Sequence, residues 1–265
     1  MKPLNQLQLI GLNNYLNEFC RIYKNKKFPN KILLSGKKGI GKSVLSYHFI
    51  NFILSENEKN NYDISNYKIN ENNQSFNLIS NNVHPNFFAI KKKPEKKKIE
   101  ISQVRELKNF VNKSSFNNIL RIILIDDIEY LSNDASNSLL KLIEEPNPNT
   151  LFILIRDNTK KILDTIKSRC INFNIFLEEK YVEEIVNNYF DKKIYNLIPN
   201  SFKKKFLSPL NYINLLTICN ENNIIIENLN SESFLKFVLD YKLYKSKQFN
   251  INELRCFIEI FFLEK

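Results

Sequence analysis

A phosphate-binding motif is the strongest constraint in this 265-residue chain, which contains only four glycines. Three of them lie in the stretch GKKGIGKS, residues 36–43, which has the form G-x-x-x-x-G-K-S. Glycines allow positive φ, so that successive backbone N–H groups point at phosphate oxygens. We expect Lys42 to neutralise β- and γ-phosphates and Ser43 to offer its hydroxyl to Mg²⁺. The motif predicts a nucleotide site formed by Gly36, Gly39, Ile40, Gly41, Lys42 and Ser43.

The segments on either side of the motif favour this interpretation over a chance glycine turn. Residues 31–35, KILLS, are typical of a short buried strand that leads into the loop. Residues 44–54 have apolar side chains at helical spacing. A helix that begins directly after the loop adds its positive N-terminal end to the phosphate site.

A second half of the site is predicted at residues 122–127, IILIDD. Four apolar residues are typical of a fully buried parallel strand. At its carboxyl end, Asp126 is expected to hold Mg²⁺ opposite the phosphate loop, often through water. Asp127 stands where many ATPases of this type place a catalytic Glu, and its side chain is one methylene shorter. The alternative is a pair of solvated acids at a strand end.

Strand and helix patterns alternate along the middle of the chain. A helix start at 132–134, SND, precedes apolar helical spacing and the sequence EEP at 144–146. A buried strand follows at 151–155, and then a helical stretch that closes with SRC at 168–170. This alternation predicts an α/β fold with a parallel sheet. From residue 209 onward the pattern is helical only.

Charge and composition leave nucleic-acid binding open. The formal net charge of +11 favours a polyanionic partner, but the abundance of Asn, Lys, Ile and Phe is typical of an AT-rich genome. Residues 91–98, KKKPEKKK, are interpreted as a basic turn between two strands. The turn either touches DNA phosphates or is a solvated hairpin tip, because it lacks interleaved aromatic residues. Residues 51–83 are rich in Asn, Ser and Glu and are interpreted as a helix end plus a mobile surface loop.

Other site classes and locations are disfavoured by the sequence. The four cysteines are far apart, so neither a disulfide scaffold nor a zinc site is expected. No apolar run reaches about 18 residues and the first residues lack a signal-peptide core, so we expect no membrane span or membrane partner. A reducing cytoplasm is the expected location.

A longer pattern resembles a known family. The run RIILIDDIEYLSNDASNSLLKLIEEPNPNTLFILI at 121–155, followed by TIKSRC at 165–170, resembles the bacterial AAA+ clamp-loader subunits of DNA polymerase III. HPNFF at 84–88 is similar to the H-P-D-aromatic element of that family, with Asn for Asp. The resemblance extends from about residue 10 to about residue 216.

The resemblance implies a domain organisation and a set of partners. It implies an AAA+ P-loop domain with a parallel sheet at residues 1–175, a helical lid at 176–207 and a C-terminal helical collar at 208–265. Implied partners are the gamma/tau and delta subunits, with the sliding clamp and primer–template DNA contacted through the complex. The implied cofactor is ATP or ADP, with Mg²⁺ held by Ser43 and Asp126 if nucleotide binds.

Within the family, several features favour the delta-prime type over the gamma/tau ATPase type. Residues 51–83 contain no cysteine, whereas the ATPase type carries a four-Cys zinc module there. Arg156 stands where a small polar residue senses γ-phosphate, and Ser208-Pro209 resembles the delta-prime form of the second sensor. The chain is also short compared with the tau form. The resemblance therefore implies weak or absent ATP hydrolysis in cis.

Arg169 is the one catalytic residue that the resemblance implies. In the family, the Arg of the S-R-C motif enters the ATP site of a neighbouring subunit, and arginine fingers are worth about 10³–10⁵ in rate in GTPase examples. The alternative is an Arg that caps a helix or pairs with a surface acid. Two other functions stay open: a gamma/tau-type or related AAA+ DNA-remodelling ATPase, and a basic nucleic-acid-binding protein.

Overall fold

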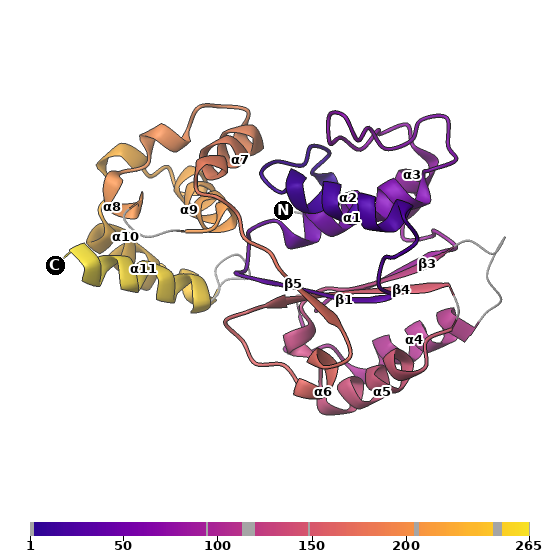
Figure 1. The fold of residues 1–265 in the computed structure, drawn as a ribbon. Helices are drawn as coiled ribbons and strands as arrows, with labels where there is room; N and C mark the ends of the chain where they lie inside the picture. Colours follow the sequence, from indigo (N-terminus) through magenta and orange to yellow (C-terminus); the bar gives the residue numbers. More distant parts are fainter. Residues whose placement is uncertain are drawn as a thin grey trace. The chain divides into compact units, whose positions relative to one another are not determined.

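The computed structural model describes residues 3–93, 95–112, 120–147, 149–203, 207–245 and 251–264. The chain divides into two compact units, Met1–Phe176 and Leu177–Lys265. The first unit contains the parallel sheet, and the second is helical in its described part (Figure 1). The predicted boundary between a lid and a collar, at residues 207 and 208, stays a prediction.

A five-stranded sheet forms the centre of the first unit. Its strand order is β2-β3-β4-β1-β5, and every adjacent pair is parallel. The central strands form because runs of Ile and Leu bury both faces of a parallel sheet. The predicted alternation of strands and helices is confirmed. The strands are β1 (Lys31–Gly36), β2 (Phe87–Ile90), β3 (Arg121–Ile125), β4 (Thr150–Asp157) and β5 (Ile171–Asn174).

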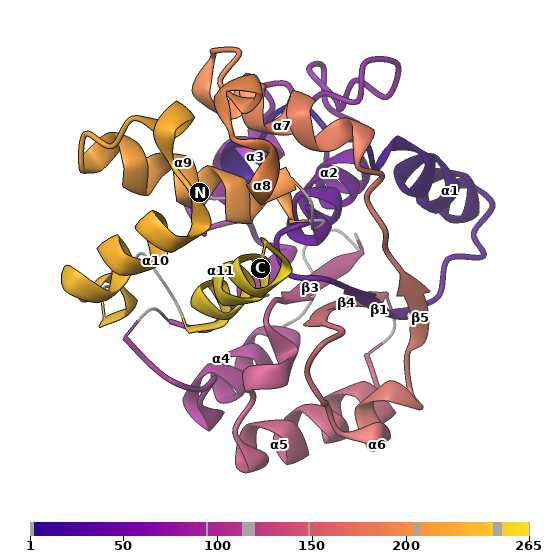
Figure 2. The same ribbon diagram turned by 90° about the vertical axis from the view of Figure 1, so that its left-hand side faces the viewer.

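Helices cover both faces of this sheet. Figures 1 and 2 show α1, α2 and α3 on one face and α4, α5 and α6 on the other. The second group packs over a core in which Ile123, Leu139 and Phe152 are fully buried. The helices are α1 (Asn13–Lys24), α2 (Lys42–Leu54), α3 (Gln74–Ser80), α4 (Ile101–Asn112), α5 (Asn133–Glu144) and α6 (Asp164–Lys167).

The segment after α2 differs from the expected mobile loop. It contains α3 and buries Tyr62 and Ile69. Asn73 caps α3 by accepting a hydrogen bond from the Phe76 amide at 2.7 Å. The Glu58 carboxylate accepts hydrogen bonds from the first amides of the same helix. The loop prediction is wrong here because polar residues that resemble a solvated loop in sequence satisfy one another inside the fold.

The second unit has an aromatic and aliphatic core of its own. Helix α9 begins with Pro209 and is capped by Ser208 and Asn211. The rings of Phe234 and Phe257 pack with their centroids 4.9 Å apart, and both are buried. The helices are α7 (Lys180–Phe190), α8 (Asn200–Lys203), α9 (Pro209–Glu221), α10 (Ser231–Asp240) and α11 (Ile251–Glu264). Across the described ranges of both units, no helix is long and apolar enough to cross a membrane.

Candidate functional site

The phosphate loop connects the carboxyl end of β1 to the first turn of α2. Gly39 and Gly41 have φ values of +83° and +96°, which disfavour any residue with a Cβ. Gly36 is needed for space, since a Cβ there would lie 2.5 Å from the carbonyl oxygen of Ile175. Ile40 is buried. The predicted motif therefore has the backbone shape of an anion-binding loop, followed directly by a helix N-terminus.

Lys42 lies inside this loop and is only 6% exposed. Its Nζ donates hydrogen bonds to the carbonyl oxygens of Gly36 and Lys37 at 2.8 and 2.7 Å. Burial lowers the pKa of the Lys42 ammonium, while surrounding carboxylates, led by Asp157, oppose that shift. The Lys42 ammonium is therefore bound by backbone carbonyl oxygens of the loop itself.

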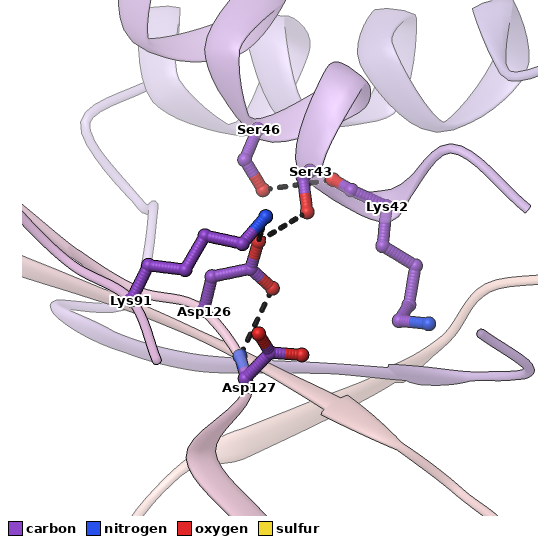
Figure 3. A network of polar contacts seen from close by, with 6 residues as sticks. All are labelled: Lys42, Ser43, Ser46, Lys91, Asp126 and Asp127. Carbon is purple, nitrogen blue, oxygen red and sulfur yellow. Dashed lines mark hydrogen bonds and ion pairs between the residues drawn. The ribbon is translucent and has the colours of Figure 1, made fainter. Parts of the chain in front are cut away.

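Asp126 and Ser43, the two predicted metal ligands, lie in direct contact (Figure 3). The Ser43 hydroxyl donates to Asp126 Oδ2 at 2.8 Å, and the Asp127 amide donates to Asp126 Oδ1 at 3.0 Å. A third partner is Lys91, whose Nζ lies 3.3 Å from the same Oδ2 atom. The structure thus brings the two halves of the predicted site together and adds an ammonium group to it.

Lys91 is a site residue that sequence reasoning missed. It directly follows β2, and β2 pairs with β3 so that Ile90 lies opposite Ile125. The residues that follow these strands, Lys91 after β2 and Asp126 after β3, therefore lie at the same end of the two strands. Predicting the contact between Lys91 and Asp126 requires knowing that β2 and β3 are neighbours in the sheet. The sequence alone does not show which strands are neighbours.

Phosphate and Mg²⁺ fit this site unequally. The glycine backbone, Lys42 and the start of α2 suit phosphate oxygens. The cation position does not suit Mg²⁺ in the same way, because Asp126 Oδ2 already receives Ser43 and Lys91. Among the residues described, no group of three or more His, Cys, Asp or Glu side chains could hold a metal ion by itself, but a nucleotide-bound Mg²⁺ needs only one or two carboxylates beside phosphate and water oxygens. Because Oδ2 is already engaged, the donors present fit a phosphate better than a metal.

Asp127, the residue at the catalytic-Glu position, has a left-handed backbone conformation with φ +61°. Burial, and next the charge of Asp126, raise the pKa of its carboxyl. The same physical cause, burial, raises the pKa of Glu129 nearby. Arg156 lies at the same edge of the sheet, in register with Ser35 at the end of β1.

Arg169 lies between α6 and β5 and is held within its own unit. Its Nη2 atom is 2.8 Å from Glu144 Oε1, and its Nη1 donates to the Thr165 carbonyl oxygen at 2.9 Å. The side chains of Arg169 and Glu144 are 35% and 46% exposed. In the single chain, Arg169 therefore pairs with a surface acid, as the alternative interpretation expects, and remains open to solvent.

Arg169 lies on the side of the sheet where the parallel strands begin, and the phosphate loop lies on the side where they end. Ile171 of β5 is in register with Ile32, near the amino end of β1, whereas the loop follows the carboxyl end of β1. At about 3.3 Å per residue, β1 advances about 16 Å between its ends. The structure therefore does not bring Arg169 together with Lys42 and Asp126.

The lysines of residues 91–98 make several contacts within the chain. Lys92 lies over the Tyr130 ring at 5.5 Å from its centroid, and Lys96 pairs with Glu100 at 3.0 Å. The segment does not join two strands, since a single bridge at Ile99 leads directly into α4. The interpretation as a turn between two strands is corrected: Ile99 forms only an isolated bridge with Leu131, and α4 begins at Ile101.

Comparison with known proteins places the chain in a family. A family model described as "DNA polymerase III, delta subunit" matches residues 11–178, more than half of the chain. The chain belongs to this family. It is 31% identical over 139 residues to DNA polymerase III subunit delta' of Pseudomonas aeruginosa, a match covering 52% of this chain and 40% of that protein. The resemblance to clamp-loader subunits of the delta-prime type is confirmed.

Other relatives define the breadth of this similarity. The chain is 29% identical over 137 residues to DNA polymerase III subunit gamma of Buchnera aphidicola subsp. Schizaphis graminum, covering 49% of this chain and 38% of that protein. The matched segment thus spans less than half the length of either curated relative. A structure of a Thermotoga maritima RuvB variant has a TM-score of 0.50 and 15% identity, covering 99% of this chain and 91% of that one. The predicted α/β fold with a parallel sheet is confirmed.

Proposed function

We propose that the chain acts as a delta-prime-like subunit of the DNA polymerase III clamp loader. It helps load the sliding clamp on primed DNA, lends Arg169 to the ATP site of a neighbouring subunit, and does not hydrolyse ATP itself. The placement of Arg169 carries this proposal: it lies at the opposite strand ends of the sheet from its own phosphate loop, and its side chain is 35% exposed.

The contacts of Arg169 are compatible with release toward a partner. An exposed ion pair contributes about 0–1 kcal/mol, because solvent screens it and side-chain entropy opposes it. The Glu144 pair is of this kind. A neighbour's triphosphate offers more negative charge than one carboxylate, so exchange of Glu144 for that phosphate is favourable. A guanidinium placed there stabilises charge on the transferring phosphoryl group.

The chain's own loop supports nucleotide binding better than turnover. Gly36, Gly39, Ile40, Gly41, Lys42 and Ser43 would hold the phosphates of ATP or ADP, and Asp126 lies beside Ser43. At the position of the catalytic base, Asp127 has a shorter side chain than Glu and a carboxyl whose pKa is raised by burial. The shorter side chain reduces its reach to an attacking water, whereas a raised pKa by itself does not weaken a general base.

Family membership supports the remaining parts of the proposal. The partners are the gamma/tau and delta subunits, and the clamp and primer–template DNA are met through the assembled complex in the cytoplasm. Residues 1–175 serve as the nucleotide-binding domain, 176–207 as the lid and 208–265 as the collar domain. If nucleotide binds with Mg²⁺, Ser43 and Asp126 are its protein ligands.

Reconstitution of the clamp loader tests the proposal. The chain is expected to co-purify with the gamma and delta subunits of the same bacterium. With primed DNA and clamp present, Arg169→Ala is expected to slow hydrolysis at the neighbouring site by at least about 10³-fold. Lys42→Ala is expected to have a much smaller effect on the complex. A chain that does not assemble, or an Arg169→Ala complex with unchanged turnover, contradicts the proposal.

An active gamma-type ATPase is the second candidate, because Lys42, Ser43 and Asp126 are all in position. Purified chain alone distinguishes the two. Sustained ATP turnover that is abolished by Lys42→Ala and unaffected by Arg169→Ala would support the second candidate. Tight DNA binding by the isolated chain with a steep salt dependence would instead support a nucleic-acid-binding function.

A further inference from the structure

We propose that the Lys91 ammonium takes the place of the divalent cation beside the phosphate loop. The nucleotide that this loop accepts is then a nucleoside di- or triphosphate without a bound metal. The nucleotide part of this inference rests on the proposed nucleotide binding. The competition between Lys91 and a divalent cation for Asp126 does not depend on nucleotide binding.

One carboxylate oxygen of Asp126, Oδ2, is directed toward Ser43 and Lys91, where a divalent cation would have to bind (Figure 3). Oδ2 accepts from Ser43 Oγ at 2.8 Å and lies 3.3 Å from Lys91 Nζ, while Oδ1 accepts from the Asp127 amide. The Asp126 side chain is only 13% exposed, so few other directions of approach remain. A divalent cation needs the same oxygen lone pairs, and it is repelled by an ammonium a few ångströms away.

Hydrogen bonds anchor the main chain of Lys91 beside Asp126, while the Lys91 side chain is 56% exposed. The Asp126 amide donates to the Ile90 carbonyl oxygen at 2.9 Å, which continues the β2–β3 ladder to the residue before Lys91. On the other side, the Lys91 carbonyl oxygen accepts from Gln103 Nε2 at 3.1 Å. Lys91 is therefore attached to the strand next to Asp126 and not to a freely moving turn.

This arrangement has a chemical consequence for the site. An ammonium supplies one positive charge and neutralises Asp126, but it does not act as a Lewis acid on phosphoryl oxygens. A nucleotide bound here would be held by the loop and by Lys42 without activation. The loop then serves as a static binding element.

Two measurements on the full chain test the inference, using Lys91→Met and, as a matched control that removes the same charge, Lys93→Met. Lys93 is exposed and lies two residues further along. Equilibrium binding of the fluorescent nucleotide mant-ADP is measured in EDTA and in excess Mg²⁺. Binding of Mn²⁺ alone is measured by electron paramagnetic resonance, without nucleotide.

We expect mant-ADP affinity of the wild type and Lys93→Met to change less than about twofold on addition of Mg²⁺. Lys91→Met should gain about tenfold or more from Mg²⁺, and should bind Mn²⁺ more tightly than the other two proteins. Equal responses of wild type and Lys91→Met to both metals would overturn the inference. If none of the proteins binds mant-ADP, the proposed nucleotide binding fails, and the Mn²⁺ titration alone decides whether Lys91 displaces a cation.

Discussion

Acidification is expected to destabilise the fold through one buried imidazole, His48. The side chain is 0% exposed, with Nε2 at 2.9 Å from the Gln6 carbonyl oxygen and Nδ1 at 2.8 Å from Tyr62 Oη. Because a carbonyl oxygen only accepts, Nε2 carries the proton and Nδ1 accepts from the Tyr62 hydroxyl. Burial lowers the pKa of His48 to about 4. The neutral ring is therefore part of the folded structure.

The magnitude follows from the difference between the folded and unfolded pKa values. Between the model-peptide value of 6.5 and about 4, only the unfolded chain takes up a proton at this position. The contribution is complete above about pH 6.5 and is lost as the pH falls toward 4, at about 1.4 kcal/mol per pH unit. The full loss over this range is about 3 kcal/mol.

The chain contains two histidines, so their ring resonances can be followed one by one by NMR. We expect His48 to remain mostly neutral down to about pH 5, and urea unfolding of the wild type to show a loss of stability to which His84, whose pKa burial also lowers, adds. His84→Gln leaves His48 as the single titrating ring and serves as the control. A His48 resonance that titrates near its ordinary value in the folded protein would refute this account of its burial.

Two further substitutions test the local packing. Gly36→Ala places a Cβ 2.5 Å from the Ile175 carbonyl oxygen and 2.9 Å from Ile40 Cδ1, and we expect it to cost about 1–3 kcal/mol in urea unfolding; an unchanged midpoint would show that the loop and the residue after β5 do not approach so closely. Glu144→Gln removes the charge that faces Arg169 and is expected to cost less than about 1 kcal/mol. A loss of more than about 2 kcal/mol would mean that this ion pair is structural and that Arg169 is not free to leave it.

The phosphate loop and the strand before Asp126 were predictable because their signals are local. Glycine spacing at residues 36–43 fixes the backbone shape, and four consecutive apolar residues before Asp126 indicate a buried parallel strand. The contact between Ser43 and Asp126 then follows because the carboxyl ends of the parallel strands of one sheet lie on the same side, even though β4 lies between β1 and β3. The phosphate loop and the position of Asp126 can therefore be recognised from the sequence alone.

Lys91 was not predictable in the same way. Its partner is 35 residues away in sequence, and the pairing depends on which strand lies next to β3. In sequence, it is one of several similar lysines in a basic run. Residues 55–83 show the same limit, since the buried Asn73 and the carboxylate of Glu58 make internal hydrogen bonds that composition does not indicate.

The proposed role of Arg169 as an arginine finger comes from the family resemblance, and its location beside Glu144 comes from the structure. The most direct measurement is a structure of the assembled clamp loader bound to ATP and primed DNA. We predict that the Arg169 guanidinium has left Glu144 and lies within hydrogen-bond distance of a neighbouring subunit's γ-phosphate. Arg169 still paired with Glu144, with every neighbouring triphosphate out of its range, would contradict the account.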